Sequence, residues 1–215
     1  MNIAILGGTG KEGAGLATRW ALVGHSIIIG SRDRERAKTK ATELREHTHR
    51  VPIIGESNAE AARLGTVIVV ALPAQGLEAT LPEVRDGCRG KVVISTVVPL
   101  TFGGPRLFTP PPAGSSAEEA QALLPEAKVV AAFHHIAAHE LSASEHAIEC
   151  DLLLCGDAEG RKVAAELGQS MGLRAVDVGA LTNAGALEGI TAVLATINRR
   201  YKLKNSGIKI TGLPA

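Results

Sequence analysis

The residues best suited to chemistry lie near the start of the chain, in a glycine-rich stretch. Gly8, Gly10 and Gly13 form the pattern G-x-G-x-x-G between the apolar run Ile3–Leu6 and a stretch of helical periodicity, Gly13–Val23. Glycines in this strand–loop–helix context permit a tight turn and let backbone N–H groups approach a pyrophosphate at the helix N-terminus. The loop therefore predicts a dinucleotide-binding site, and the alternative is a glycine-rich turn that binds nothing.

A second group of residues lies about twenty residues further on. Ser31, Arg32 and Arg36 follow the apolar run Ser26–Ile29, where chains that bind a free ribose hydroxyl carry an acidic residue. A carboxylate at this place would repel a phosphate, whereas a hydroxyl and two guanidinium groups one helical turn apart suit a phosphate dianion. The pattern predicts NADP(H) rather than NAD(H). The neighbouring charges are interpreted as a solvated helix start: Asp33, Arg34 and Glu35.

A third group contains histidines that follow the apolar run Val129–Phe133. His135 and His139 are spaced i, i+4, which is compatible with a metal site, but no H-E-x-x-H pattern is formed and the histidines directly follow a strand. We therefore predict no metal. His139 and His146 are interpreted as surface or hydrogen-bonded residues, and His134, at the end of the strand, is predicted to line a cleft.

No further catalytic constellation is present in the sequence. It has no nucleophile elbow, and its only tyrosine, Tyr201, lies in a basic segment with Arg199, Arg200, Lys202 and Lys204. Hydride transfer between two stacked rings needs no acid or base, only two ligands held face to face with water excluded. The basic segment would suit a polyanionic second ligand, and the alternative is a solvated helix end.

The elements that must position these residues are short apolar runs alternating with helical stretches. Most of the runs are nearly continuous in Val, Ile and Leu, which is typical of strands covered on both faces. This alternation predicts an α/β fold with a doubly wound, Rossmann-type parallel sheet. Further strands are predicted at 52–54, 66–72, 91–96, 152–155 and 174–178, and further helices at 34–47, 58–64, 77–84, 116–124 and 158–171.

The last part of the chain has a different character. Apolar residues at helical spacing over Thr182–Leu203 predict a long amphipathic helix, which docks on the sheet or on a second copy of the chain. The long irregular segment Pro99–Gly114 is interpreted as a cleft-lining loop or a linker. We predict an NADP-binding domain at residues 1–150 and a smaller C-terminal part at residues 151–215 that completes a second-substrate cleft.

The composition of the chain restricts its location and partners. With 215 residues, a net charge of +1 and no apolar run of about 20 residues, nothing favours nucleic acid or a membrane as a partner. A sequence typical of a β-strand begins at Asn2, which leaves no room for a signal peptide. The three cysteines show no C-x-x-C spacing and are interpreted as reduced thiols in a cytoplasmic protein.

Several stretches together resemble the NADPH:F420 oxidoreductases over essentially the full length of the chain. They are IAILGGTGKEGAGLA, GSRDRERAK, ALP at 71–73, VVP at 97–99, FHHIAAHEL, LLLCGD, ALTNAGALEGIT and the terminal GIK. The resemblance implies a homodimer whose partners are small-molecule coenzymes, and reversible hydride transfer between NADPH and the deazaflavin coenzyme F420.

The resemblance also implies roles for individual residues. The pyrophosphate loop would be formed by Thr9, Gly10, Lys11, Glu12 and Gly13, and the 2′-phosphate pocket by Ser31, Arg32 and Arg36. Ala74, Val98 and Ala138 would lie along the NADP(H) cofactor. Ile136 and Ala137 would lie between the two rings, with His134, Thr191 and Gly207 also at the F420 site. The chain departs from the family pattern in two ways: Ala74 stands where members often carry a bulky aromatic residue, and Gly185 and Gly189 stand where polar side chains that touch the deazaflavin are expected.

Two other functions remain compatible with the sequence. One is an NADPH-dependent reductase of a flavin or of a small imine or carbonyl compound on the same fold. The other is a module that senses NADP(H) without catalysis and engages a partner protein through its long helix and the segment Pro99–Gly114.

Overall fold

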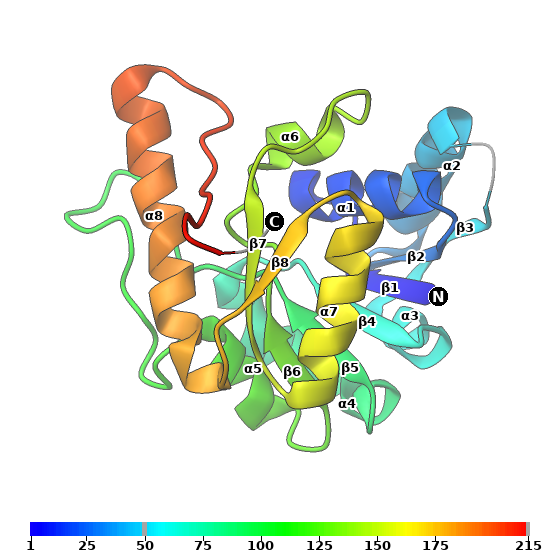
Figure 1. The fold of residues 1–215 in the computed structure, drawn as a ribbon. Helices are drawn as coiled ribbons and strands as arrows, with labels where there is room; N and C mark the ends of the chain where they lie inside the picture. The colour runs from blue at the N-terminus through cyan, green and yellow to red at the C-terminus, as the bar shows by residue number, and fades with distance from the viewer. Residues whose placement is uncertain (49–50, 214–215) are drawn as a thin grey trace.

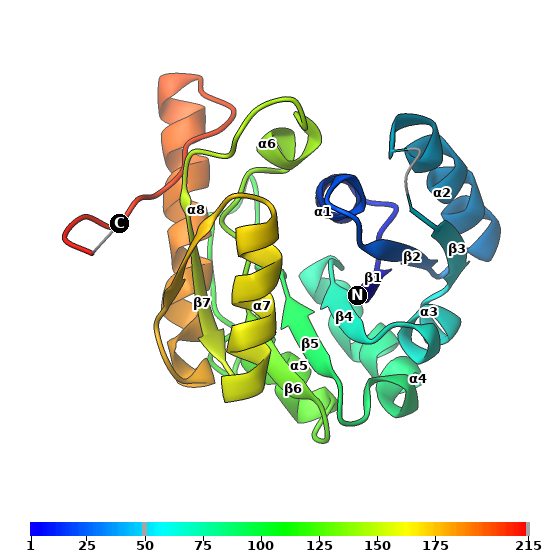
Figure 2. The same cartoon turned by 45° about the vertical axis from the view of Figure 1, so that its right-hand side comes forward.

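The computed structural model describes residues 1–48 and 51–213 and contains one eight-stranded sheet with the order β3-β2-β1-β4-β5-β6-β7-β8 (Figures 1 and 2). Neighbouring strands are parallel except β6 and β7. The predicted α/β fold with a doubly wound sheet is therefore confirmed, and the sheet is mostly parallel. The strands are β1 (Asn2–Leu6), β2 (Ser26–Ser31), β3 (Ile53–Ser57), β4 (Val67–Val70), β5 (Val92–Ser95), β6 (Lys128–Ala131), β7 (Asp151–Gly156) and β8 (Arg174–Asp177).

Helices cover both faces of the sheet. Alternate residues of β1 enter different cores: Ile3 and Ile5 pack with helices α1, α2, α6 and α7, whereas Ala4 and Leu6 pack with α3, α4, α5 and α8. This two-sided burial explains why the strands read as continuous apolar runs. The helices are α1 (Lys11–Leu22), α2 (Arg34–Thr48), α3 (Asn58–Leu64), α4 (Leu77–Cys88), α5 (Ser116–Leu123), α6 (Ala138–Ser142), α7 (Ala158–Ser170) and α8 (Ala184–Tyr201), with 3₁₀ turns η1 (Ala74–Gly76) and η2 (Leu181–Asn183).

The direction of β7 differs from the expectation of parallel neighbours. β7 runs antiparallel to β6, with Ala131 opposite Cys155. A parallel connection would have to return to the starting edge of the sheet. Instead, the chain after β6 forms the short helix α6, which was not predicted and which packs on α1. Since the connection stays at this end of the sheet, the next strand can only run back in the opposite direction.

The C-terminal part continues the same sheet. β7 begins at Asp151, and α8 packs against α5 and β7. The segment after α8 returns to the sheet, where the carboxylate of Asp151 accepts hydrogen bonds from Arg174, at 2.7 Å, and from the backbone N–H of Ile210, at 2.6 Å. The division of the chain at residue 150 stays a prediction.

Among the described residues, no helix combines the length and the apolar character that crossing a membrane requires.

Candidate functional site

A cavity of about 590 Å³ lies where β1, β2 and β4 end. Eight of the predicted cofactor residues line it: Thr9, Gly10, Lys11, Glu12, Gly13, Ser31, Arg32 and Arg36. The remaining lining residues are Gly7, Asp33, Asn58, Ala71, Leu72 and Pro73. The structure thus brings the glycine loop and the Ser31–Arg36 segment, which are distant in sequence, to one opening at the carboxyl edge of the sheet.

The glycine loop turns tightly between β1 and α1. Gly7 has φ of +76°, and the N–H of Gly8 donates to the carbonyls of Ile5 at 3.1 Å and Gly30 at 3.0 Å. A Cβ atom on Gly13 would lie 2.8 Å from the Cα atom of Gly8, so a side chain there would push α1 off the strand. Since α1 begins at Lys11, its N-terminal N–H groups and the positive end of its dipole face the cavity.

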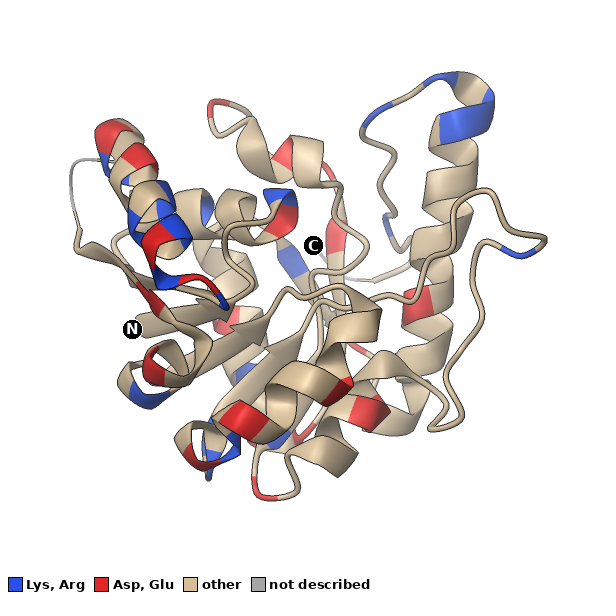
Figure 3. Cartoon of the chain, turned by 180° about the vertical axis from the view of Figure 1, so that it is seen from behind, with Lys and Arg blue, Asp and Glu red and all other residues tan. Residues whose placement is uncertain are grey.

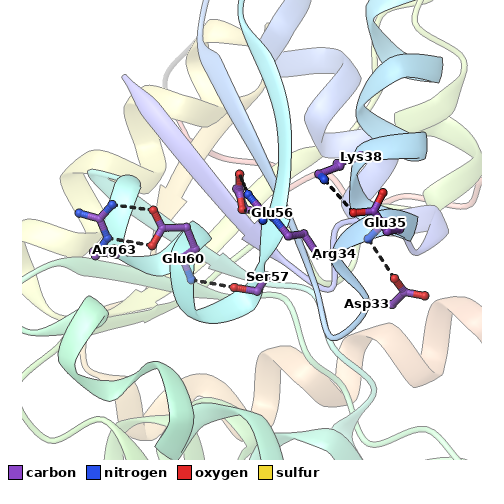
Figure 4. Close-up of polar contacts among 8 residues, drawn as sticks. All are labelled: Asp33, Arg34, Glu35, Lys38, Glu56, Ser57, Glu60 and Arg63. Atoms are coloured by element: carbon purple, nitrogen blue, oxygen red, sulfur yellow. Dashed lines mark hydrogen bonds and ion pairs between the residues drawn. The ribbon is translucent and has the colours of Figure 1, made fainter.

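The second group of predicted residues forms the rim of this cavity. The hydroxyl of Ser31 accepts from the N–H of Asp33 at 3.2 Å. Arg32 and Arg36 are exposed, and neither forms an ion pair with another described residue. Arg34, by contrast, donates to both carboxylate oxygens of Glu56, at 2.8 and 3.0 Å (Figure 4). Two guanidinium groups at the rim are therefore available to a ligand.

The charged residues Asp33, Arg34 and Glu35 form a solvated start of α2, as the sequence indicated. The carboxylate of Asp33 accepts from the N–H groups of Glu35 at 3.0 Å and Arg36 at 3.1 Å, and the side chain of Glu35 pairs with Lys38 (Figure 4). Asp33 thereby satisfies two of the N–H groups at the helix start that have no partner within the helix.

Asn58 is a site residue that the sequence reasoning missed. Its side chain is buried, its Oδ1 atom accepts from the N–H of Gly7 at 3.3 Å, and the residue lines the cavity. A Cβ atom on Gly30 would lie 2.9 Å from this oxygen, so glycine in β2 leaves room for the amide. A polar residue directly after β3, at the carboxyl edge of the sheet, was the available signal.

A second cavity, of about 600 Å³, lies beyond β6. Ile136, Ala137 and Gly207, predicted for the second ligand, line it. The other lining residues are His135, Glu140, His146, Ala147, Ile148, Glu149, Cys150, Asn205 and Ser206. A small adjoining cavity of about 120 Å³ contains the other two predicted residues, His134 and Thr191, in its wall. Ala74, Val98 and Ala138 follow β4, follow β5 and begin α6, but none of them lines these three cavities.

His134 and His135, which follow β6, are buried and neutral, whereas His139 and His146 are exposed. Burial lowers the pKa of His134 to about 3, with the neighbouring His135 as a smaller cause. Burial also lowers the pKa of His135, whose Nε2 atom lies 2.9 Å from the carbonyl oxygen of Asp151. The carbonyl of His134 accepts from the hydroxyl of Thr191 at 3.2 Å, which ties this segment to α8. An imidazole with so low a pKa is a poor proton donor at neutral pH.

Arg19 fixes the wall between α1 and the second cavity. Its guanidinium is buried and donates to four backbone carbonyls, at 2.6–3.2 Å, within α6 and in the segment that follows it: Glu140, Leu141, Ala143 and His146. A Cβ atom on Gly15 would lie 2.6 Å from that of Leu141, so the two helices also approach closely. Sequence reasoning missed Arg19, although a basic residue beside Leu16 and Trp20 on the apolar side of α1 was visible.

Gly185 and Gly189, where the family pattern has polar side chains, lie on α8 next to the segment Pro99–Gly114. A Cβ atom on Gly185 would lie 2.8 Å from the carbonyl oxygen of Gly114, so α8 begins in close contact with the segment before α5. On Gly189 it would lie 3.7 Å from the ring of Phe108, an ordinary contact. Segment Pro99–Gly114 therefore packs against α8, and its residues line neither of the two larger cavities.

Within residues 1–48 and 51–213, no three His, Cys, Asp or Glu side chains are arranged to hold a metal ion.

Comparison with known proteins identifies the family. Residues 2–99 match the sequence profile described as NADP oxidoreductase, coenzyme F420-dependent. The F420-dependent NADP reductases of Methanocaldococcus jannaschii and Methanothermobacter thermautotrophicus are each 40% identical to the chain. The alignments cover 99% of both sequences for the former, and 100% of this chain and 96% of the relative for the latter.

Solved structures agree in fold. A crystal structure from Arthrobacter sp. FB24, of a protein provisionally named an F420-dependent NADP reductase, superposes with a TM-score of 0.83 at 26% identity over 97% of this chain and 98% of that one. A reductive aminase from Aspergillus terreus in complex with NADPH shares the fold alone, with a TM-score of 0.62 at 16% identity over 94% of this chain and 62% of that one. From the full-length identity to the curated relatives, the chain belongs to the F420-dependent NADP reductase family.

Proposed function

We propose that this protein transfers a hydride reversibly between NADP(H) and coenzyme F420. The observation that carries the proposal is the presence of two cavities of similar volume, about 590 and 600 Å³, connected by helix packing. α6 begins directly after Ala137 in the wall of the second cavity and packs on α1, whose first residues line the first cavity. Family membership supports this assignment of the two ligands.

The first cavity fits NADP(H). The glycine loop leaves the backbone accessible because side chains at Gly7 and Gly13 would collide with neighbouring atoms, and α1 directs its N-terminal N–H groups at a diphosphate. The unpaired Arg32 and Arg36, with the hydroxyl of Ser31, provide donors for a 2′-phosphate. Ala74, Val98 and Ala138, at the carboxyl edge of the sheet, are proposed to flank the nicotinamide half.

The second cavity fits a flat ligand with an anionic chain. Ile136 and Ala137 offer an apolar wall for a ring, whereas Glu140 and Glu149 in the same lining disfavour an anion nearby. The lining residues Asn205, Ser206 and Gly207 follow Lys204 directly. An anionic chain that leaves the cavity past these residues would meet the basic end of α8 and the segment after it (Figure 3).

In this proposal, catalysis depends on how the chain positions the two coenzymes relative to each other. Bound NADPH supplies the hydride from its nicotinamide ring. The chain holds the two ligands through backbone and apolar contacts and excludes water, and the neutral His134 and His135 take no proton at neutral pH. Arg19 keeps the wall residues in place by fixing α6 to α1.

The test is a direct assay with purified protein, NADPH and coenzyme F420, in which the absorbance of the deazaflavin falls as it is reduced. The same protein is offered flavins and a panel of imines and carbonyl compounds with NADPH. Reduction of F420 well above every other acceptor supports the proposal. Reduction of an imine or carbonyl compound without F420, or tight NADPH binding without turnover of any acceptor, overturns it.

We also propose that the protein is a cytoplasmic homodimer. Val193 on α8 is 58% exposed, Tyr201 at its end 66% and Phe102 on the neighbouring segment 72%. Exposed apolar side chains on the long helix and on this segment favour contact with a second copy. Cys88, Cys150 and Cys155 are free and buried, as a reducing compartment permits. Light scattering of the native protein and of the variant Val193→Lys tests the dimer: a variant that keeps the wild-type mass would exclude this helix from the interface.

A further inference from the structure

The carboxyl group of Glu12 is the one acidic group that the proposed mechanism leaves without a role in the first cavity. Glu12 lies in the first turn of α1 and lines the cavity with Thr9, Gly10 and Lys11. Its Oε1 atom is buried without a hydrogen-bond partner among the described residues. A buried oxygen of this kind is costly unless a ligand or a proton satisfies it. An acidic residue in a diphosphate-binding loop therefore needs an explanation.

The strand order shows which part of the dinucleotide Glu12 faces. Ser31 ends β2 and marks the 2′-phosphate side, whereas Thr96 directly follows β5, on the other side of β1 and β4. The hydroxyl of Thr96 donates to the carbonyl of Val70 at 3.2 Å and lies near the carboxyl group of Glu12. The side chain of Glu12 therefore extends away from the adenosine side of the loop, toward the nicotinamide half of the bound cofactor.

The surroundings favour the neutral form of this carboxyl group. Burial raises the pKa of Glu12 to about 8, and the nearby hydroxyl of Thr96 opposes this shift only in part. β1, β4 and β5 carry no titratable side chain. The pKa shift of Glu12 has no contribution from the charged groups of the helices packed on α1, nor from Lys11 and Arg19 on α1 itself. The charged and titratable groups of these helices are His139 and Glu140 on α6, and Arg34, Glu35, Arg36, Lys38, Lys40, Glu43, Arg45, Glu46 and His47 on α2. A diphosphate nearby would favour protonation further, since two anions repel.

We propose that Glu12 binds the cofactor as a neutral carboxylic acid, whose O–H donates a hydrogen bond to an oxygen of NADP(H) on the nicotinamide side of the diphosphate bridge. This inference rests on the assignment of NADP(H) to the first cavity, and it adds a residue that tunes cofactor affinity with pH. Loss of the proton removes the donor and places a carboxylate against the diphosphate.

The experiment compares two ligands by isothermal titration calorimetry between pH 7 and pH 9. NADP⁺ should bind about ten-fold more weakly at pH 9 than at pH 7, since that is the loss of the protonated form for a group that titrates near pH 8. Adenosine 2′,5′-bisphosphate, which lacks the nicotinamide half and the diphosphate bridge, should show no such change. Phosphate monoesters titrate near pH 6, so the 2′-phosphate keeps its charge over this range.

The variant Glu12→Gln keeps a donor but cannot ionise, so its affinity for NADP⁺ should not change between pH 7 and pH 9. The proposal is overturned if wild-type protein binds NADP⁺ equally at both pH values, if the bisphosphate shows the same loss, or if the glutamine variant retains the loss. The two-ligand comparison on wild-type protein decides the matter even if the variant does not fold. Hydride transfer to F420 is measured separately, so failure of the proposed reaction leaves this pH dependence intact.

Discussion

The two large cavities, which we propose to hold the two coenzymes, are built by different means. The first, at β1, β2 and β4, depends on local features: glycines where a side chain would collide, a helix N-terminus and charged side chains at the rim. The second depends on how distant segments meet. Residues 135–137, 146–150 and 205–207 form its wall, and a side chain from α1 holds α6 in place. A binding site for phosphate groups can be formed by a short continuous segment of the chain. A binding site for a flat ring here requires three segments that are distant in sequence to pack together.

The largest effect is expected from Arg19→Ala, which removes the link between the two regions. Four backbone carbonyls would lose a charged donor within a buried junction, so the free energy of unfolding should fall by about 3 kcal/mol or more. Chemical denaturation measures this loss. The control Arg34→Ala removes an exposed arginine and should change stability little.

An Arg19→Ala variant as stable as the wild type would show that the two regions are held together by other contacts. If the variant folds, its KM for F420 should rise more than its Kd for NADPH, because Arg19 contacts the segment around the second cavity.

Arg32→Ala should affect only the first region. A lost charge-assisted hydrogen bond to the 2′-phosphate should weaken NADPH binding by about 10- to 100-fold and leave NADH binding nearly unchanged. Calorimetric titration of both cofactors measures the difference. Arg45→Ala, an exposed arginine on the same helix but outside the cavity, is the matched control. Equal losses for NADPH and NADH would contradict the 2′-phosphate assignment.

His134 should contribute to stability more than to chemistry. Its pKa is about 3 when folded and near 6.5 when unfolded, so the unfolded state binds the proton first. The stability that it contributes is complete above pH 6.5 and is lost as the pH falls toward 3, by about 2 kcal/mol between pH 7 and pH 5. Unfolding of His134→Gln over this range should depend less on pH, with exposed His47→Gln as control.

The turnover of His134→Gln should fall by less than about ten-fold, since a neutral buried imidazole is not expected to transfer a proton. A loss of several orders of magnitude, without a matching loss of stability, would show that His134 acts in the reaction itself.

The smallest effect is expected at the basic segment. Replacing Lys202 and Lys204 together with alanine should raise the KM for F420 about three-fold at low salt, because exposed charges attract an anionic chain only weakly and salt screens them. The difference should shrink as ionic strength rises. Lys162→Ala, an exposed lysine on α7, is the control. An unchanged KM at every salt concentration would leave the segment without a role in binding.

The contrast between the two regions also explains what could be read from the sequence. The glycine loop, the strands and the longer helices were predictable because each depends on spacing within about twenty residues. The grouping of Ser31, Arg32 and Arg36 at the loop was predictable because parallel strands present their carboxyl ends at one edge.

What could not be read depends on contacts across the chain. The direction of β7 follows from the packing of α6 on α1, and the sequence between β6 and β7 is long enough for either direction. The position of Arg19 on the apolar side of α1 indicated burial, but its four carbonyl acceptors could not be predicted because they lie more than 120 residues away. The chemistry of Glu12 was equally hidden, since burial rather than residue type determines its protonation.

The single tryptophan of the chain lies at the junction of the two regions. The indole N–H of Trp20 donates to the carbonyl of Leu167 at 3.2 Å, and its ring stands edge-on to that of Phe133, 5.3 Å away. Phe133 directly precedes the segment that leads to the second cavity, and it holds a left-handed backbone with φ of +67°. Tryptophan fluorescence, excited at a wavelength that Tyr201 does not absorb, therefore comes from one known position in this protein. A change in this emission when either coenzyme is added would report on that junction without any label.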